Sequence, residues 1–306
     1  MKVMRKDVII DCEKIEATIL EKNVMQEVDH PFLVGLEFCF QTEGKVYLVM
    51  QFYRGGELFT HLQAARRFTE ARAKRYALQI ALSLAHLHKR EILYRDLKPE
   101  NLLLGEDGYI YLTDFGLAKK VEEDEVAKSS CGTPEYMAPE MVTEAGHSFP
   151  VDWWALGIIT YEMLVSFAPF YTGETNGANK KMKDMILNKA VFFPNAKQHG
   201  FELSEPAKDF ISKLLAKKPE ERLGSKNGAS EILEHPWLAG IDQDKLLSKE
   251  IEIDESEKPQ LSDDPLKLEY FSNEFLASQP TRDSLVNLKQ RKKIKEHKHL
   301  FDDFDR

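Results

Sequence analysis

The chain has 306 residues, enough for one large domain with a tail or for two modest domains. A hydrophobic fraction of 42% predicts a globular protein, and a net charge of −9 argues against general nucleic-acid binding. Three scattered cysteines indicate neither a disulfide framework nor a zinc site, and no apolar run reaches membrane-spanning length. No signal peptide is visible, so we expect a cytoplasmic protein, with nuclear or peripheral-membrane locations as alternatives.

The first fifty residues predict strands around one helix. The opening MKVMRKDVII has the pattern of the end of a buried strand that carries Lys2. Residues 13–28 place apolar side chains at helical spacing. LVGLEFCF and VYLVM, separated by the polar QTEGK turn, predict a strand hairpin.

The rest of the chain is expected to be mainly helical. Thr69 is a suitable N-cap for a long helix that ends near His88. LLL, GEDG and YIYL predict a second, smaller hairpin, and helices dominate after residue 150. Beyond Leu238 the chain becomes polar and acidic, which indicates an extension laid over a domain. The predicted fold class is therefore α+β, with a small strand-rich part, a larger helical part and a tail.

The most informative run is YRDLKPEN at residues 94–101, because it is followed by a DFG triplet that begins at Asp114. Two hairpin-linked loops would bring four polar side chains together: Asp96, Lys98, Asn101 and Asp114. Phosphoryl transfer needs such a set. A carboxylate accepts the proton of the attacking hydroxyl, a lysine offsets phosphoryl charge, and oxygen ligands hold Mg²⁺.

CGTPEY and APE follow at residues 131–140, and with YRDLKPEN and DFG they make the chain resemble the eukaryotic protein kinases over residues 1 to about 238. The chain resembles the AGC group of serine/threonine kinases in three features: Tyr94 in the catalytic loop, the lysine of DLKPEN and the sequence motif CGTPEYMAPE. The tail segments YFSNEF (270–275) and FDDFD (301–305) also match that group. The resemblance implies a two-lobed kinase fold, ATP and Mg²⁺ as cofactors, and serine/threonine phosphorylation.

The resemblance also implies a division of the chain. A kinase domain would cover residues 1–238, with a small N-lobe at 1–50, a hinge at 51–53 and a helical C-lobe at 54–238. Residues 239–306 would form the C-terminal extension of the AGC group. A monomer is expected.

Roles in catalysis follow from the same resemblance. Asp96 would be the catalytic base, with Lys98 beside the transferred phosphate, while Asn101 and Asp114 would bind Mg²⁺. Met50 would guard the back of the adenine pocket. The complete ATP-binding set implied by the resemblance is Lys2, Glu21, Met50, Gln51, Phe52, Tyr53, Glu57 and Leu103.

Structural roles can be transferred in the same way. Lys2 would reach the α- and β-phosphates and pair with Glu21, although both residues could instead be plain surface charges. Glu140 would be held by Arg222 in a structural ion pair, and Asp152 would support the catalytic loop from below.

Three glutamates suggest the substrate. Glu57, Glu100 and Glu162 match acidic positions with which AGC kinases bind arginine upstream of the acceptor residue. Each of them alone is more often an exposed charge. We therefore expect protein substrates with basic motifs.

Regulation is expected at two places. Ser129 would be an activating phosphosite for an upstream kinase, with Arg95 as the partner of its phosphate. Phe301 and Phe304 would dock in a groove beside the helix at 13–28. The basic run KQRKKIKEHK (289–298) is expected to be a solvated tail segment, with a membrane-surface patch as the alternative.

One kinase motif is missing from the chain. G-x-G-x-x-G should precede the strand that carries Lys2, yet it occurs nowhere in the sequence. Three interpretations remain open: an incomplete record of an active enzyme, a non-catalytic kinase-like binding or scaffold module, and an enzyme that works without this loop. We also expect the Lys2 strand to be an unpaired edge of a sheet with about three strands.

Overall fold

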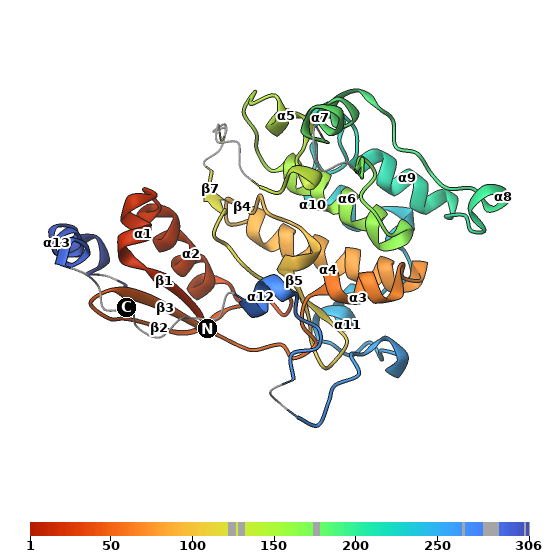
Figure 1. Cartoon of the computed structure of the whole chain (residues 1–306). Helices are drawn as coiled ribbons and strands as arrows, with labels where there is room; N and C mark the ends of the chain where they lie inside the picture. Colours follow the sequence, from red (N-terminus) through yellow and green to blue (C-terminus); the bar gives the residue numbers. More distant parts are fainter. Residues whose placement is uncertain are drawn as a thin grey trace.

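The computed structural model describes residues 1–121, 127, 132–173, 178–264, 267–277, 288–302 and 304–305. Figure 1 shows two unequal lobes, a smaller one built on a sheet and a larger one built from helices, with the last part of the chain returning to the small lobe. None of the helices within these ranges combines the length and the apolar character needed to cross a bilayer.

The small lobe consists of a three-stranded antiparallel sheet and two helices. β1 (Lys2–Arg5), β3 (Lys45–Met50) and β2 (Leu36–Gln41) follow one another in that order across the sheet, so β1 is an edge strand as expected. β2 and β3 form the predicted hairpin, with an irregularity between Leu36 and Phe38. Val46 and Leu48 of β3 are fully buried.

The prediction for the first ten residues was only half right. The strand ends at Arg5, and the apolar run Val8–Ile10 belongs to helix α1 (Lys6–Asp11). A short apolar run fits a strand and a buried helix equally well, so periodicity could not separate the two. Ile9 and Ile10 are buried, and α1 packs beside α2. Helix α2 covers Ile15–Glu27, which confirms the helix predicted over 13–28.

The large lobe is built around two long helices that contact each other, α4 (Glu70–His88) and α6 (Pro150–Val165). The hydroxyl of Thr69 accepts a hydrogen bond from the Arg72 amide, which confirms Thr69 as the N-cap of α4. The remaining helices of this lobe are α3 (Leu58–Ala65), α5 (Pro139–Val142), α7 (Ala178–Asn188), α8 (Ala196–His199), α9 (Glu205–Leu214) and α10 (Ala229–Leu233). Short 3₁₀ turns cover Pro99–Asn101, Pro134–Tyr136, Pro219–Glu221 and Pro236–Leu238.

Four short strands lie between α4 and α5. β5 (Leu102–Leu104) and β6 (Ile110–Leu112) form the predicted second hairpin. β4 (Ile92–Leu93) pairs with β7 (Lys119–Lys120). The Tyr94 hydroxyl, after β4, donates to the Thr113 carbonyl oxygen, after β6, at 2.5 Å, so the loops that follow these two strands start side by side.

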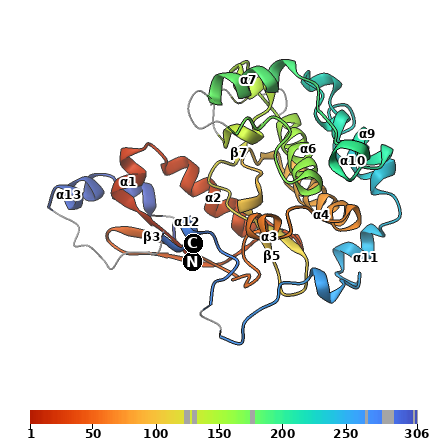
Figure 2. The same cartoon turned by 45° about the vertical axis from the view of Figure 1, so that its right-hand side comes forward.

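The last part of the chain contacts both lobes. It contains α11 (Gln243–Leu247), α12 (Asn273–Ala277), α13 (Leu288–Glu296) and 3₁₀ turns at Glu255–Glu257 and Lys298–Phe301. Figure 2 shows α12 close to the junction of the lobes and α13 beside α1. The basic run predicted to be a solvated segment thus lies mostly in a helix. Ile294 of α13 is buried because the helix packs on α1.

Candidate active site

A cleft of about 880 Å³ lies where the two lobes and the tail meet. This volume is typical of small-molecule sites. Side chains from β1, α2, the 51–53 segment, the loops after β4 and β6, and the tail line it. The predicted site residues on its wall are Lys2, Glu21, Met50, Gln51, Phe52, Tyr53, Glu57, Lys98, Glu100, Asn101, Leu103 and Asp114.

Lys2 links the two sides of this cleft. Its Nζ lies 2.6 Å from Oε1 of Glu21 on α2 and 2.9 Å from Oδ1 of Asp114 in the loop after β6. Burial lowers the pKa of Lys2, but the charges of Glu21 and Asp114 outweigh it, so this pKa lies above its ordinary value. Burial raises the pKa of Glu21 despite the charge of Lys2. The expected pair of Lys2 and Glu21 is present, and Asp114 joins it.

Asp114 is held in a left-handed conformation, with φ of 61°. Its Oδ1 accepts a hydrogen bond of 3.1 Å from the Gly116 amide. Burial raises its pKa, but Lys2 and the Gly116 amide reverse that effect and the pKa is lowered. Within the described part of the chain, its second carboxylate oxygen has no hydrogen-bond partner. Asp114 is therefore an ionised group with one oxygen available to a cation.

The loop after β4 brings Asp96, Lys98 and Asn101 together, as predicted. Asn101 donates from Nδ2 to the carbonyl oxygen of Asp96 at 2.8 Å and to its Oδ2 at 3.0 Å. Lys98 Nζ lies 2.9 Å from the same Oδ2. These contacts hold the Asp96 carboxylate in one orientation.

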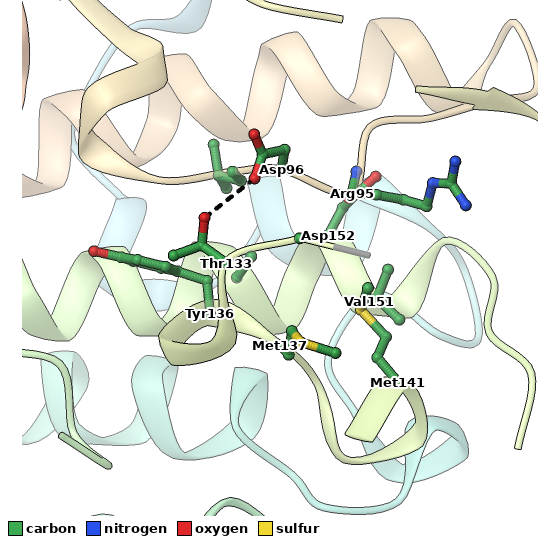
Figure 3. A pocket seen from close by; sticks show the side chains of 11 residues that line it. Arg95, Asp96, Thr133, Tyr136, Met137, Met141, Val151 and Asp152 are labelled. Atoms are coloured by element: carbon green, nitrogen blue, oxygen red, sulfur yellow. Dashed lines mark hydrogen bonds between the residues drawn. The ribbon is translucent and has the colours of Figure 1, made fainter. Parts of the chain in front are cut away.

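Thr133 is a site residue that the sequence analysis missed. Its hydroxyl donates to Asp96 Oδ1 at 3.4 Å and accepts from Lys98 Nζ at 3.2 Å. Figure 3 shows the threonine turned toward Asp96. Its place in the CGTPEY motif marked it as a member of a conspicuous run. The motif does not indicate which side chain the threonine contacts.

Asp152 lies beneath the loop that carries Asp96. It is 1% exposed and accepts hydrogen bonds from the Tyr94 amide at 2.9 Å and the Arg95 amide at 2.8 Å. Arg95 has a φ of 68°. Because a non-glycine residue in this region is strained, the two amide contacts to Asp152 help to maintain the turn.

The floor of the site contains a cavity of about 10 Å³, between Asp152 and the segment that starts at Thr133 (Figure 3). This is close to the smallest space that can hold one water molecule. The expected ion pair of Glu140 and Arg222 is also present. Two nitrogens of Arg222 donate to the two carboxylate oxygens of Glu140, at 2.6 and 2.9 Å.

The tail forms part of the cleft wall. Phe271 stacks on Phe52 with 5.5 Å between ring centroids, and Ser272 Oγ donates to Glu57 Oε1 at 3.2 Å. The Glu57 amide also donates to the carbonyl oxygen of Tyr270 at 2.8 Å. YFSNEF thus contacts the hinge side of the cleft.

The three glutamates predicted to bind substrate form one acidic group. Burial raises the pKa of Glu100, and the charge of Glu57 adds to the effect. Burial raises the pKa of Glu162 to about 7, and the charge of Glu100 acts in the same direction. Glu162 also accepts a 2.7 Å hydrogen bond from the Tyr136 hydroxyl.

Phe301 and Phe304 lie against the small lobe, and each is 2% exposed. Gln41 of β2 donates to the carbonyl oxygen of Phe301 at 2.9 Å. Lys22 of α2 lies 5.8 Å from the Phe304 ring. The two rings therefore occupy a groove beside α2. Lys22, which contacts Phe304, directly follows Glu21 in the sequence. Ser129 lies outside the described residues.

The known proteins that this chain is similar to are protein kinases. The protein kinase domain family matches residues 1–238. The chain is 46% identical to Protein kinase 2 of Dictyostelium discoideum over 253 residues, which is 83% of this chain and 50% of that protein. It is 38% identical over 305 residues to the cAMP-dependent protein kinase catalytic subunit of the same organism, covering 99% of this chain and 44% of that protein. It is 39% identical over 283 residues to the human RAC-beta serine/threonine-protein kinase, covering 92% of this chain and 56% of that protein. The chain thus spans about half the length of these curated relatives.

Proposed function

The chain belongs to the protein kinase family, AGC group, and from this premise we propose that it transfers the γ-phosphoryl group of ATP to serine or threonine hydroxyls of proteins. One observation carries the proposal. Lys2 contacts Glu21 and Asp114 in the cleft whose wall also contains Lys98 and Asn101. A surface lysine would not make both contacts.

The residues of the cleft fit ATP with Mg²⁺. Mg²⁺ prefers hard oxygen ligands and keeps several waters, so one carboxylate and one amide oxygen suffice beside phosphates. Asp114 and Asn101 would hold the ion, and Lys2 would hold the phosphates. When bound, Mg²⁺ neutralises charge on the transferring group.

The remaining chemistry belongs to the chain itself. The Asp96 carboxylate would accept the proton of the acceptor hydroxyl. Asn101, Lys98 and Thr133 keep that carboxylate in place, so no reorientation is needed during transfer. Lys98 also carries positive charge beside the reacting oxygens.

The substrate preference and the regulation belong to the same proposal. The acidic group of Glu57, Glu100 and Glu162 suits a guanidinium upstream of the acceptor residue. Phosphorylation of Ser129 by an upstream kinase would supply an anion for Arg95. We further propose that the chain acts as a monomer in the cytoplasm, and that residues 239–306 serve as the extension of a domain at 1–238.

The test is a phosphoryl-transfer assay with a serine peptide that contains upstream arginines. The Asp114→Asn variant should lose at least about 100-fold in activity, because the negatively charged carboxylate ligand is replaced by a neutral amide. Asp244→Asn, at an exposed position on α11, is the matched control and should retain full activity. Equal activity of wild type and Asp114→Asn would refute the assigned site.

A further inference from the structure

A strongly basic segment lies on a chain that is otherwise acidic. Residues 289–298 contain six lysines and arginines and a single glutamate, whereas the whole chain has a net charge of −9. The proposed phosphoryl transfer does not use this segment, because it lies on α13, away from the cleft.

One side of α13 is turned toward the small lobe. Ile294 is 4% exposed, and Lys293 forms an ion pair with Asp11 of α1. Gln290 Nε2 donates to Asp7 Oδ2 at 2.8 Å. These contacts fix the rotation of the helix about its axis, so the residues on its other side are presented outward.

The outward side is the basic surface, made of Arg291, Lys292, Lys295 and Lys298. All four are exposed. Arg291 and Lys295 are four residues apart and share one face of α13, with Lys292 beside them, and Lys298 is the first residue of the 3₁₀ turn that follows the helix. Among the described residues, Lys292, Lys295 and Lys298 have no ion-pair partner, and Arg291 lies 4.0 Å from Glu43. The basic surface is thus largely uncompensated.

The basic surface lies at the outer end of the small lobe. Figures 1 and 2 both show α13 at that end of the molecule, beyond α1 and opposite the large lobe. Charges farther apart than about 8 Å are largely screened at physiological salt. The acidic remainder of the chain therefore does little to oppose an anionic surface that approaches α13 from outside.

We propose that the basic surface docks this protein on an anionic phospholipid bilayer. None of its four members is apolar, so the interaction is charge to charge, without insertion into the hydrocarbon. Each lysine or arginine near such a surface strengthens binding about fivefold. Four of them together contribute about 600-fold. The proposal is independent of phosphoryl transfer, since it concerns binding alone.

The experiment is co-sedimentation of the full chain with vesicles of phosphatidylcholine, with or without about 30% phosphatidylserine. The test variant carries Arg291→Gln, Lys292→Gln, Lys295→Gln and Lys298→Gln, which retain helix propensity. The matched control carries four exposed substitutions on the large lobe: Lys183→Gln, Lys189→Gln, Lys197→Gln and Lys226→Gln. Equal thermal midpoints of the three proteins would verify that all are folded.

Wild type and control should bind the phosphatidylserine vesicles at low salt and be released at 0.5 M NaCl, where screening shortens to a few ångströms. The test variant should bind at least tenfold more weakly. The proposal would be overturned if the control variant lost as much vesicle binding as the test variant. Equal binding of wild type to vesicles with and without phosphatidylserine would also overturn it. Binding to polyglutamate without binding to vesicles would also overturn it and favour an acidic protein partner.

Discussion

At the scale of single residues, the site depends on charges that lie close together in partly buried surroundings. Glu21 is 2% exposed and has Lys2 within 2.6 Å, so its carboxylate is both desolvated and paired. Removing one partner of such a pair costs more than the pair itself contributes, because the other charge stays buried without compensation. Activity should therefore be sensitive to Glu21.

Glu21→Gln should lower kcat/KM by about 10- to 100-fold, because Lys2 then keeps only Asp114 and shifts away from the phosphates. Steady-state kinetics with varied ATP would measure it. Glu16→Gln, at an exposed position on the same helix, is the control and should behave as wild type. An unchanged kcat/KM in Glu21→Gln would show that the pair does not position Lys2 for phosphoryl transfer.

Glu162 makes folding stability depend on pH. Its pKa in the folded protein is about 7, above the ordinary value of 4.5, so the folded state holds this proton more tightly than the unfolded state. Stability should therefore fall as pH rises from about 4.5 to about 7. Glu162→Gln removes this loss and should be more stable than wild type at pH 8, by at most about 3 kcal/mol.

Urea unfolding at pH 5 and pH 8 would test this effect. The difference in the free energy of unfolding between Glu162→Gln and wild type should be larger at pH 8 than at pH 5. The Tyr136 hydroxyl can still donate a hydrogen bond to the amide oxygen of the variant. Glu220→Gln, at an exposed position, should show no such pH dependence. A constant difference at both pH values would contradict the raised pKa.

At the scale of elements, the small lobe is held together partly by the end of the chain. Phe301 and Phe304 fill a groove bordered by α1, α2 and β2. The side chains of Gln41 and Cys39 donate hydrogen bonds to the backbone carbonyl oxygens of Phe301 and Phe304, respectively. The same segment therefore supports the helix that carries Glu21. Loss of these rings should affect both stability and the position of α2.

Phe301→Ala should destabilise the small lobe by about 3 kcal/mol, because a fully buried aromatic ring is removed and a cavity remains. Hydrogen exchange should report faster opening of α2 and β2 than of α6. Phe192→Ala, at a position that is 58% exposed, is the control. Identical exchange of α2 in Phe301→Ala and wild type would mean that the tail does not support this helix.

At the scale of the whole molecule, both lobes and the tail contribute to one cleft. A ligand that binds there contacts residues that are far apart in the sequence, such as Lys2, Asp114 and Phe271. Such a ligand binds only the folded state, so it should raise the unfolding temperature.

Saturating Mg-ATP should raise the thermal midpoint by about 2–4 °C. Asp114→Asn should show a smaller shift with Mg-ATP, because Asp114 would help to hold the ion. Differential scanning fluorimetry with and without Mg²⁺ would measure both shifts. The absence of any shift in wild type would favour the non-catalytic, scaffold interpretation.

Local patterns in the sequence were sufficient for much of the fold. Thr69 as a cap, the two hairpins and the helix over 13–28 depend on neighbouring residues only, so they could be predicted. The motifs around Asp96 and Asp114 likewise indicated phosphoryl transfer, since their residue types match the chemistry. Val8–Ile10 could not be assigned, because a strand and a buried helix require the same short apolar run.

The sequence alone thus determined the family and most of the local elements, and it supplied the groups that we propose to be reactive. Only the tertiary structure decided which distant groups meet: Thr133 with Asp96, Ser272 with Glu57, and α13 with α1. These contacts join residues many positions apart, and their partners depend on how the chain packs. Periodicity and motifs report on neighbours along the chain, whereas burial and charge pairing depend on the whole folded molecule.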